Sequence, residues 1–414
     1  MMILLALLCL VGTPLFAIIA ASAMIGYQSE GIDLMALVIE ILGLANMPFL
    51  SAIPLFTVSG YLLSESGAPK RLVRLTNAML GWMPCGLAIV SLFACAFFTA
   101  FTGASGVTII AIGAILYPAL KTDGYSEKFS LGLITTSGSL GLLFAPSLPL
   151  ILYGVIAEVS IDDLFKAGLL PGILMLLMLS FYCLWVGRHS SREIKPFNFD
   201  ELINAFRESA WELPLPIIVL GGIYSGFFAV SEAAAITALY VICIEVLLLK
   251  EIKIADLPRL MRESMLLVGG ILIVLAVSLA STNYMIDSGV PQQLFFTISS
   301  VISDQFTFLA LLLLFLLILG AILDIFAAIV LVVPLLLPVA NQYGIDEIHL
   351  GIIFLSAMQL GYLTPPVGLN LFIASYRFDK SIAAVYAATL PFFAILFISV
   401  ILITYWPTLT LFLL

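Results

Sequence analysis

One acidic residue, Asp324, lies inside the apolar stretch "LLLLFLLILGAILDIFAAIVLVVPLLLPV", which holds no other charged residue. No Lys or Arg occurs between Arg262 and Arg377, so the surrounding sequence supplies no cationic partner. An isolated carboxylate in so apolar a stretch is energetically unfavourable, and such residues commonly mark ion or proton pathways. The alternative is a carboxyl group that is hydrogen-bonded within a static core. We expect Asp324 to help bind a cation.

Four further segments combine Gly, Ser, Thr and Pro with apolar neighbours. They are "FTGASGVT" (101–108), "TTSGSLGLLFAPS" (135–147), "LGAILDIF" (319–326) and "YLTPPVGLN" (362–370). Such segments break helices, and unpaired backbone groups in lipid cost several kcal/mol each, so breaks are tolerated only where protein or a cavity surrounds them. Carbonyl and hydroxyl oxygens at a break suit Na⁺, and helix N-termini suit an anion. Close helix packing is the alternative for any single Gly or Ser, but the paired recurrence of these clusters favours a binding site.

The composition requires most of these elements to lie in a membrane. Hydrophobic residues make up 63% of the 414 residues and charged residues 10%, and the mean hydropathy is +1.21. A spanning helix needs about 20 apolar residues, and we expect roughly ten to twelve segments at membrane depth, some of them re-entrant. Residues 1–23 could form a signal peptide, but they carry no basic residue, which favours a first membrane helix.

Eleven of the 16 basic residues fall in three clusters that the positive-inside rule assigns to the cytoplasm. The clusters are Lys70, Arg71 and Arg74; Arg188, Arg192, Lys195 and Arg207; and Lys250, Lys253, Arg259 and Arg262. Residues 190–212 form the one long polar connection, and phenylalanines alternate there with charges. This pattern predicts an amphipathic helix that lies along the membrane surface and joins two halves. Glu40, Glu232 and Glu245 lie near the ends of apolar runs and are interpreted as interfacial.

Two motifs recur in the same order. "SESGAPKRL" (64–72) resembles "IDSGVPQQL" (286–294) at an offset of 222 residues, and "LGLLFAPSLPL" (140–150) resembles "LGYLTPPVGLN" (360–370) at an offset of 220. A nearly constant offset indicates a duplicated unit.

The charges indicate that the two copies are inverted. Lys70 and Arg71 of the first copy are replaced by glutamines in the second, which lies one apolar helix (264–285) beyond the third basic cluster. Equivalent loops on opposite faces define an inverted-topology repeat, as in secondary transporters. We therefore predict an all-α polytopic membrane protein with a first repeat at 1–189, a connecting arm at 190–212 and a second repeat at 213–414.

At these motifs the sequence resembles the large membrane subunit (DctM-like) of the tripartite ATP-independent periplasmic, or TRAP, transporters. The resemblance covers nearly the whole chain. The matching motifs are "IPLFTVSGYLL", "SGAPKRL", "TGASGVT", "SGSLGLLFAPSLPLILYG", "GAILDIFAAIVLVVPLLLPV" and "QLGYLTPPVGLNLF". The family usually has a double proline where this chain has Ala145-Pro146, and a Ser-Gly-Ser cluster where it has residues 102–105.

The resemblance implies an elevator-type importer in the bacterial inner membrane, in which a mobile domain with two re-entrant hairpins carries substrate across a fixed scaffold. It also implies Na⁺ coupling, a small membrane subunit, and a periplasmic binding protein that delivers an organic acid anion. An enzyme and a nucleic-acid partner are not expected. Because no extra four-helix module or soluble binding domain is evident, we expect both partners to be separate polypeptides.

The resemblance further implies which residues bind ions and substrate. On the first hairpin and its neighbouring broken helix, the expected Na⁺ site comprises Gly103, Ser105, Ser137, Gly138, Gly141 and Pro146. On the second, it comprises Asp324, Thr364, Pro365 and Pro366. Ser139, Ser147 and Asn370 are the expected substrate contacts, and Asn370 is also a candidate for the second ion site.

Two other functional classes compete with this interpretation. A stand-alone Na⁺-coupled carboxylate carrier would share the inverted repeat but need no binding protein. A membrane-embedded enzyme is disfavoured because the sequence offers no paired nucleophile and base. The sequence does not distinguish a dicarboxylate, a sugar acid or a small sulfonate as substrate.

Overall fold

The computed structural model describes residues 13–44, 46–47, 50–187 and 197–414, and the regular elements among them are all helices. Seven of these helices are long and apolar enough to cross a membrane, or eight if the bent pair 127–143 and 148–157 forms one span. Five shorter apolar helices accompany them. The prediction of an all-α polytopic membrane protein is therefore confirmed. The part of the predicted first membrane helix at 1–12 lies outside the described residues.

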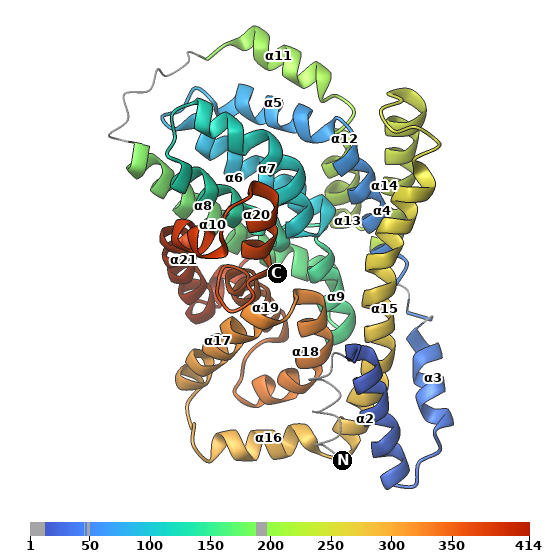
Figure 1. Cartoon of the computed structure of the whole chain (residues 1–414). Helices are drawn as coiled ribbons and strands as arrows, with labels where there is room; N and C mark the ends of the chain where they lie inside the picture. Colours follow the sequence, from blue (N-terminus) through green and yellow to red (C-terminus); the bar gives the residue numbers. More distant parts are fainter. Residues whose placement is uncertain (1–12, 45, 48–49, 188–196) are drawn as a thin grey trace.

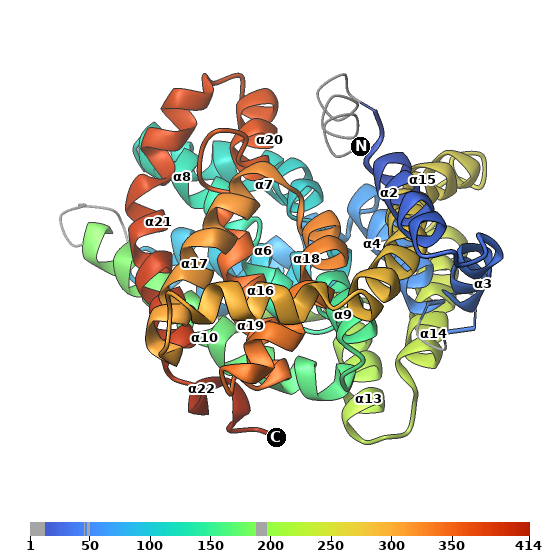
Figure 2. The same cartoon turned by 90° about the horizontal axis from the view of Figure 1, so that it is seen from below.

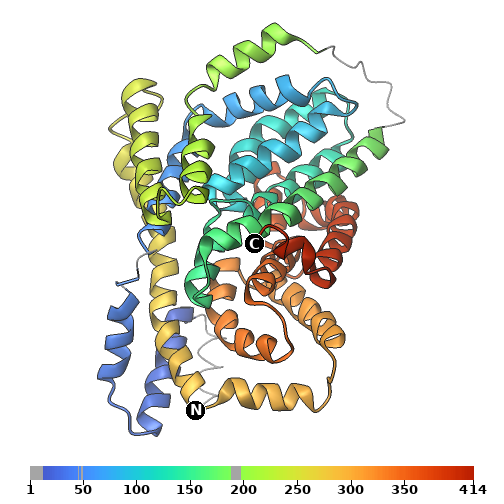
Figure 3. The same cartoon turned by 180° about the vertical axis from the view of Figure 1, so that it is seen from behind.

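One side of the molecule is a panel built around the long helix α15 (Leu257–Asp287) (Figures 1 and 3). Helices α2 (Leu15–Ser29), α3 (Met35–Leu44) and α4 (Ala52–Glu65) pack against it. Helix α14 (Val230–Ile242) packs on α4 and continues as a π-helical segment, Cys243–Leu248. A shorter element precedes α14 and is made of α12 (Pro214–Pro216), a π-helical segment (Ile217–Gly221) and α13 (Gly222–Tyr224).

The rest of the chain forms a helical body beside this panel (Figures 1 and 2). It contains two helical hairpins, which are α6 (Gly86–Thr102) with α7 (Ser105–Thr122) and α17 (Gln305–Ile322) with α18 (Ile325–Gln342). It also contains two broken helices. The first is α8 (Glu127–Ser137), a 3₁₀ turn (Leu140–Leu143) and α9 (Leu148–Ala157), and the second is α19 (Glu347–Gly361) and α20 (Leu369–Phe378). Helices α10 (Ile161–Gly187), α21 (Ile382–Tyr405) and α22 (Thr408–Leu411) complete the body.

All four breaks predicted from the sequence occur where the Gly, Ser and Pro clusters lie. Residues 103–104 separate α6 from α7, and residues 323–324 separate α17 from α18. The stretches 138–147 and 362–368 interrupt the two broken helices. Helices α8 and α19 each begin at a capping side chain. The Ser126 hydroxyl accepts a hydrogen bond from the backbone N–H of Phe129, and the Asp346 carboxylate accepts from the backbone N–H groups of Ile348 and His349.

Two transverse helices, called arms below, join the panel to the body. Arm α5 (Ala68–Leu80) leads from α4 into the first hairpin, and arm α16 (Val290–Ser299) leads from α15 into the second. An ion pair of 3.0 Å joins Arg259 in the first turn of α15 to Glu65 at the end of α4, so α5 starts beside the beginning of α15. Arm α16 follows the other end of α15, and Figure 1 shows the arms at opposite ends of the molecule. This is the arrangement that an inverted repeat requires.

The predicted connection 190–212 contains helix α11 (Phe199–Glu208), which packs along arm α5. Its residues 190–196 lie outside the described part of the chain, as do the basic residues Arg188, Arg192 and Lys195. Arg74 of α5 pairs with Glu201 at 2.8 Å and with Glu208. Phe199 is 64% exposed and Phe206 is 40% exposed, so α11 keeps an apolar surface beside the ion pairs that bind it to α5.

Glu245, which the sequence placed near the end of an apolar run, is buried among charged residues of other helices. The residue is only 1% exposed, and its carboxylate lies 3.4 Å from the guanidinium of Arg71. A buried carboxylate needs compensating charge or hydrogen bonds. The sequence does not reveal this pairing, because the compensating arginine is 174 residues away in the chain.

Candidate functional site

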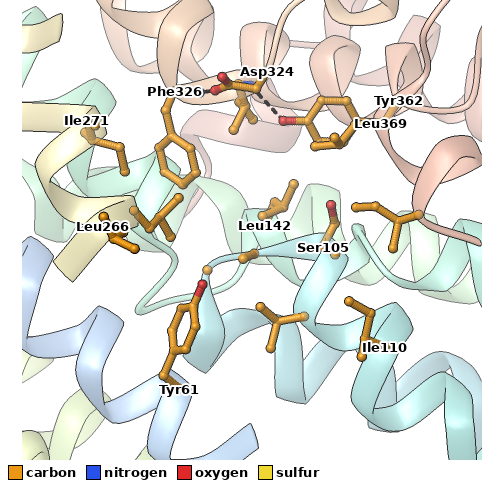
Figure 4. Close-up of a pocket in the computed structure, with 18 of the residues that line it drawn as sticks. Tyr61, Ser105, Ile110, Leu142, Leu266, Ile271, Asp324, Phe326, Tyr362 and Leu369 are labelled. Carbon is orange, nitrogen blue, oxygen red and sulfur yellow. Dashed lines mark hydrogen bonds between the residues drawn. The ribbon is translucent and has the colours of Figure 1, made fainter. Parts of the chain in front are cut away.

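The two hairpin tips face each other across a cavity of about 570 Å³ between the panel and the body (Figure 4). Residues of α4 and α15 close it on the panel side, among them Tyr61, Leu266 and Ile271. Among the described residues that line it, Asp324 is the only charged one. Of the predicted site residues, Gly103, Ser105 and Asp324 lie in its wall.

At the first tip, α7 begins without a side-chain cap among the described residues. Ala104 has extended backbone (φ −132°, ψ 115°), and its methyl group cannot accept a hydrogen bond. Gly103, at φ +64°, turns the chain there, and an added Cβ would lie 2.6 Å from Leu148 Cγ. The first amides of a helix are unpaired within the helix itself and carry its positive dipole end. Ser105, Gly106 and Val107, the first residues of α7, all line the cavity.

At the second tip, the corresponding amides are already occupied. Asp324 Oδ1 accepts hydrogen bonds from the backbone N–H groups of Phe326 (2.8 Å) and Ala327 (3.0 Å). The amide of Ile325 donates to the Tyr362 hydroxyl at 2.7 Å. Asp324 is solvent-exposed in the cavity wall rather than buried in a static core. This tip therefore presents a negative charge where the first tip presents backbone N–H groups.

The first break packs tightly behind the first hairpin. Thr99 of α6 donates to the Gly138 carbonyl at 2.9 Å and contacts the Thr108 hydroxyl at 2.7 Å. A Cβ added to Gly141 would lie 2.2 Å from the carbonyl oxygen of Ala96, so only glycine allows this approach. The other predicted residues of this break, Ser137, Ser139, Pro146 and Ser147, lie behind the tip and do not line the cavity.

The second break packs against the second hairpin in a similar way. The carbonyl of Ala321 accepts from the amides of Val367 and Gly368, both at 3.1 Å. Thr364 donates to the carbonyl of Gly361 at 2.7 Å. Pro365 and Pro366 are exposed and stand outside the cavity wall.

Asn370 connects the two breaks. Its side chain is fully buried, and its Nδ2 donates to the carbonyl of Thr135 on α8 at 3.3 Å. Its Oδ1 has no hydrogen-bond partner in the described part of the chain. Because Asn370 lies on α20 of the second half and contacts α8 of the first, it lies between the two predicted sites.

Several buried oxygens in this region lack a protein partner among the described residues. They are Thr102 Oγ1, Thr136 Oγ1, Ser147 Oγ, Ser356 Oγ, Gln359 Oε1 and Asn370 Oδ1. Buried polar atoms are nearly always hydrogen-bonded, and oxygen atoms are the ligands that hard cations prefer. Sequence reasoning found Ser147 and Asn370 but missed the other four. The offset of 220 residues connects three of them, because it relates Thr136 to Ser356, and the predicted Ser139 to Gln359.

Comparison with known protein families shows which family this chain belongs to. Residues 1–409 match the family described as the tripartite ATP-independent periplasmic transporter, DctM component. The chain belongs to this TRAP family. This match establishes that the chain is a multi-pass membrane transporter with permeases as relatives, as the sequence motifs predicted.

Two curated members of the TRAP family illustrate its range. The C4-dicarboxylate TRAP transporter large permease protein DctM of Pseudomonas aeruginosa is 34% identical over 363 residues, which is 87% of this chain and 85% of that protein. The isethionate TRAP transporter permease protein DctMQ of Oleidesulfovibrio alaskensis is 32% identical over 98% of this chain but only 65% of its own length.

A solved structure shares the fold. The YdaH transporter of Alcanivorax borkumensis, whose crystal structure is described as having an unusual topology, superimposes with a TM-score of 0.53 at 14% identity. The match covers 90% of this chain and 87% of that one. At this identity the similarity concerns the arrangement of helices and not the substrate.

Proposed function

We propose that this chain is the large membrane subunit of a Na⁺-coupled TRAP importer that carries a small organic acid anion by an elevator mechanism. The single observation that best supports the proposal is the chemical contrast between the two hairpin tips. One tip offers uncapped backbone N–H groups to the cavity, and the other offers the carboxylate of Asp324.

The contrast suits an anion and a cation that travel together. A carboxylate or sulfonate can accept from the first amides of α7 and from the Ser105 hydroxyl, with no arginine or lysine among the described lining residues. A Na⁺ ion is attracted to Asp324 and needs about six oxygen ligands. Ser, Thr and Asn oxygens behind the tips, including those without protein partners, are the candidates to supply the rest. Binding of each ion then favours binding of the other, because their charges attract.

An elevator needs a moving part that is distinct from a fixed part. The helical body carries both tips and both breaks, whereas the panel contributes only the opposite wall of the cavity. We propose that the body moves along the panel as a unit. The arms α5 and α16 are the described links through which the hairpins meet the panel.

We also propose that the chain consists of two repeats, 1–189 and 213–414, which the connection 190–212 joins. Helix α7 starts at Ser105 and α18 at Ile325, and both contain 18 residues. The capping residues Ser126 and Asp346 are also 220 positions apart. Equal lengths at a constant offset support two copies of one unit around the cavity.

The partners and the cargo follow from the family. We propose a small membrane subunit and a periplasmic binding protein as partners, and the bacterial inner membrane as the location. A C4-dicarboxylate and isethionate appear in the names of two relatives, and both are small acid anions. We propose the same chemical class for this chain.

The proposal is tested by reconstitution in liposomes with the small subunit. We expect uptake only when an inward Na⁺ gradient and the cognate binding protein are both present, and we expect ATP to have no effect. The controls replace the Na⁺ gradient with a K⁺ gradient and the binding protein with one specific for another acid. Rapid uptake of free substrate by this chain alone, with no gain from a binding protein, would instead establish the stand-alone carrier.

A further inference from the structure

A second group of charged residues lies far from the cavity, where arm α5 meets the panel. The guanidinium of Arg71 contacts three carboxylates: Glu212 just after α11, Glu245 in the π-helical end of α14, and Glu251 in the loop before α15. We call these four residues the Arg71 cluster. Arg71, Glu212 and Glu245 have side chains that are 9%, 3% and 1% exposed.

The charges in this cluster do not balance. Three ionised carboxylates beside one guanidinium would leave two uncompensated negative charges in a largely buried site, which is strongly unfavourable. Glu212 Oε2 also has no hydrogen-bond partner among the described residues, although it is buried within the cluster. The cluster therefore has room for one more positive charge, and a proton is the smallest that fits.

The positions of Glu245 and Glu251 show where that proton belongs. Both carboxyl groups approach the same guanidinium of Arg71, and two carboxyl groups that share one site favour a state in which one of them is protonated. The backbone holds the pair together, because the amide of Glu251 donates to the carbonyl of Glu245 at 3.0 Å.

Glu251 is the ionised member of the pair. Burial acts to raise its pKa, but hydrogen bonds from Arg71 and from the amide of Gly67, at 2.6 Å, outweigh burial and lower the pKa below its usual value. Glu245 is more deeply buried, and its nearest Arg71 nitrogen is 3.4 Å away. Burial raises the pKa of Glu212, but its carboxylate accepts directly from Arg71 Nε at 2.6 Å.

We propose that the Arg71 cluster is a proton-binding site, with the proton on Glu245 and shared with Glu251, and that this proton holds arm α5 against the panel. Loss of the proton leaves adjacent buried carboxylates that repel each other, which weakens the attachment of α5 to the loop at 250–252. The site is separate from the transport cavity, and it does not depend on the proposed function.

The surroundings offer no other described group to replace the proton. Besides the cluster itself, Tyr240 of α14 is the titratable residue that faces Glu212 and Glu245, and its hydroxyl donates to the carbonyl of Trp211 at 2.9 Å. On the neighbouring surface, Arg259 of α15 pairs with Glu65 of α4 and with Glu263. Lys250 and Lys253 beside Glu251 have exposed side chains.

Infrared difference spectroscopy of the full-length chain in nanodiscs tests the proposal, because the carbonyl stretch of a protonated carboxyl group is distinct from the bands of a carboxylate. We expect a band that disappears as the pH rises from about 5 to about 9. Glu245→Gln should remove this band and still fold, because the amide can donate to Glu251 as the protonated acid does. Glu201→Gln, which removes an exposed partner of Arg74 on the same helix as Arg71, should leave the band unchanged.

The linkage to stability gives a second measurement. Because the native state binds a proton that the unfolded state releases above the ordinary glutamate pKa, stability should fall as the pH rises through this range. We expect the unfolding temperature to drop by about 3 °C more in the wild type than in Glu245→Gln between the two pH limits. Glu251→Gln should also remove the infrared band, because Glu245 then ionises beside Arg71. A wild-type band and pH slope retained in both glutamine variants would overturn the proposal.

Discussion

The tip of the first hairpin and the tip of the second hairpin occupy equivalent places but differ in the residue at the N-cap of their second helix. Ala104 precedes α7 and leaves its first amides uncapped, whereas Asp324, 220 residues later, caps α18 through Phe326 and Ala327. Both tips line the same cavity. A duplicated scaffold can therefore present opposite charge preferences through the residue that stands at the N-cap of each tip.

The difference also separates two roles of Asp324. Its carboxylate satisfies backbone amides, as any N-cap does, and it supplies the only charge among the described residues of the cavity wall. The first role needs an oxygen acceptor and the second needs a negative charge. Substitutions at the two tips can test the roles one at a time.

The largest effect is expected from Asp324→Asn, which keeps the cap but removes the charge. Na⁺-driven uptake in liposomes should fall about 100-fold, because the proposed Na⁺ site would lose its one ionised ligand. The unfolding temperature should change little. Asp346→Asn is the matched control, since it makes the same change at the N-cap of α19 outside the cavity wall, and it should transport normally. Undiminished uptake by Asp324→Asn would assign the residue to helix capping alone.

A smaller effect is expected from Ala104→Asp, which gives the first tip the chemistry of the second. The extended backbone of Ala104 suits an N-cap, so the carboxylate should occupy the amides of α7 and raise stability by about 1 kcal/mol. The same carboxylate should repel an anionic substrate and raise its KM about tenfold or more. Ala104→Asn, a neutral cap, separates blocking of the amides from repulsion. An unchanged KM in the aspartate variant would show that the anion binds elsewhere.

The smallest effect is expected from Gly103→Ala, which changes the turn and no charge. Alanine at φ +64° costs about 1 kcal/mol, and the added Cβ would contact Leu148, so the unfolding temperature should fall by a few degrees. Gly269→Ala is the control, because the methyl group there meets no atom within 4 Å in the middle of α15 and should stabilise the helix. An equal drop in the unfolding temperature of both variants would show that the turn at Gly103 does not require glycine.

Sequence alone predicted the features that depend on local chemistry. Helix breakers such as Gly103 and Pro366 act on their own neighbourhood, so all four breaks could be located from the sequence. The position of Asp324 at a break also followed from the sequence, because an isolated charge in an apolar run is visible in one dimension.

Features that depend on distant contacts could not be predicted in this way. The burial of Glu245 beside Arg71 could not be foreseen, because Arg71 lies on another helix, far away in the sequence. The Tyr362 hydroxyl pairs with the amide of Ile325, and a tyrosine beside a Thr-Pro-Pro turn gives no sign of this. Thr136 and Ser356 resemble any other helix-buried hydroxyl until the two halves are aligned.

The length of α15 sets a relation between this protein and the thickness of its bilayer. The apolar part, residues 264–285, spans about 33 Å, close to the roughly 30 Å of a typical hydrocarbon layer. One arm starts beside each end of this helix, so the two arms sit a fixed distance apart, near opposite lipid surfaces. A thinner or thicker bilayer would tilt α15 or expose its ends, and so displace both arms relative to the hairpins that they carry. Transport by this chain should therefore depend on acyl-chain length even where lipid headgroup and charge are held constant.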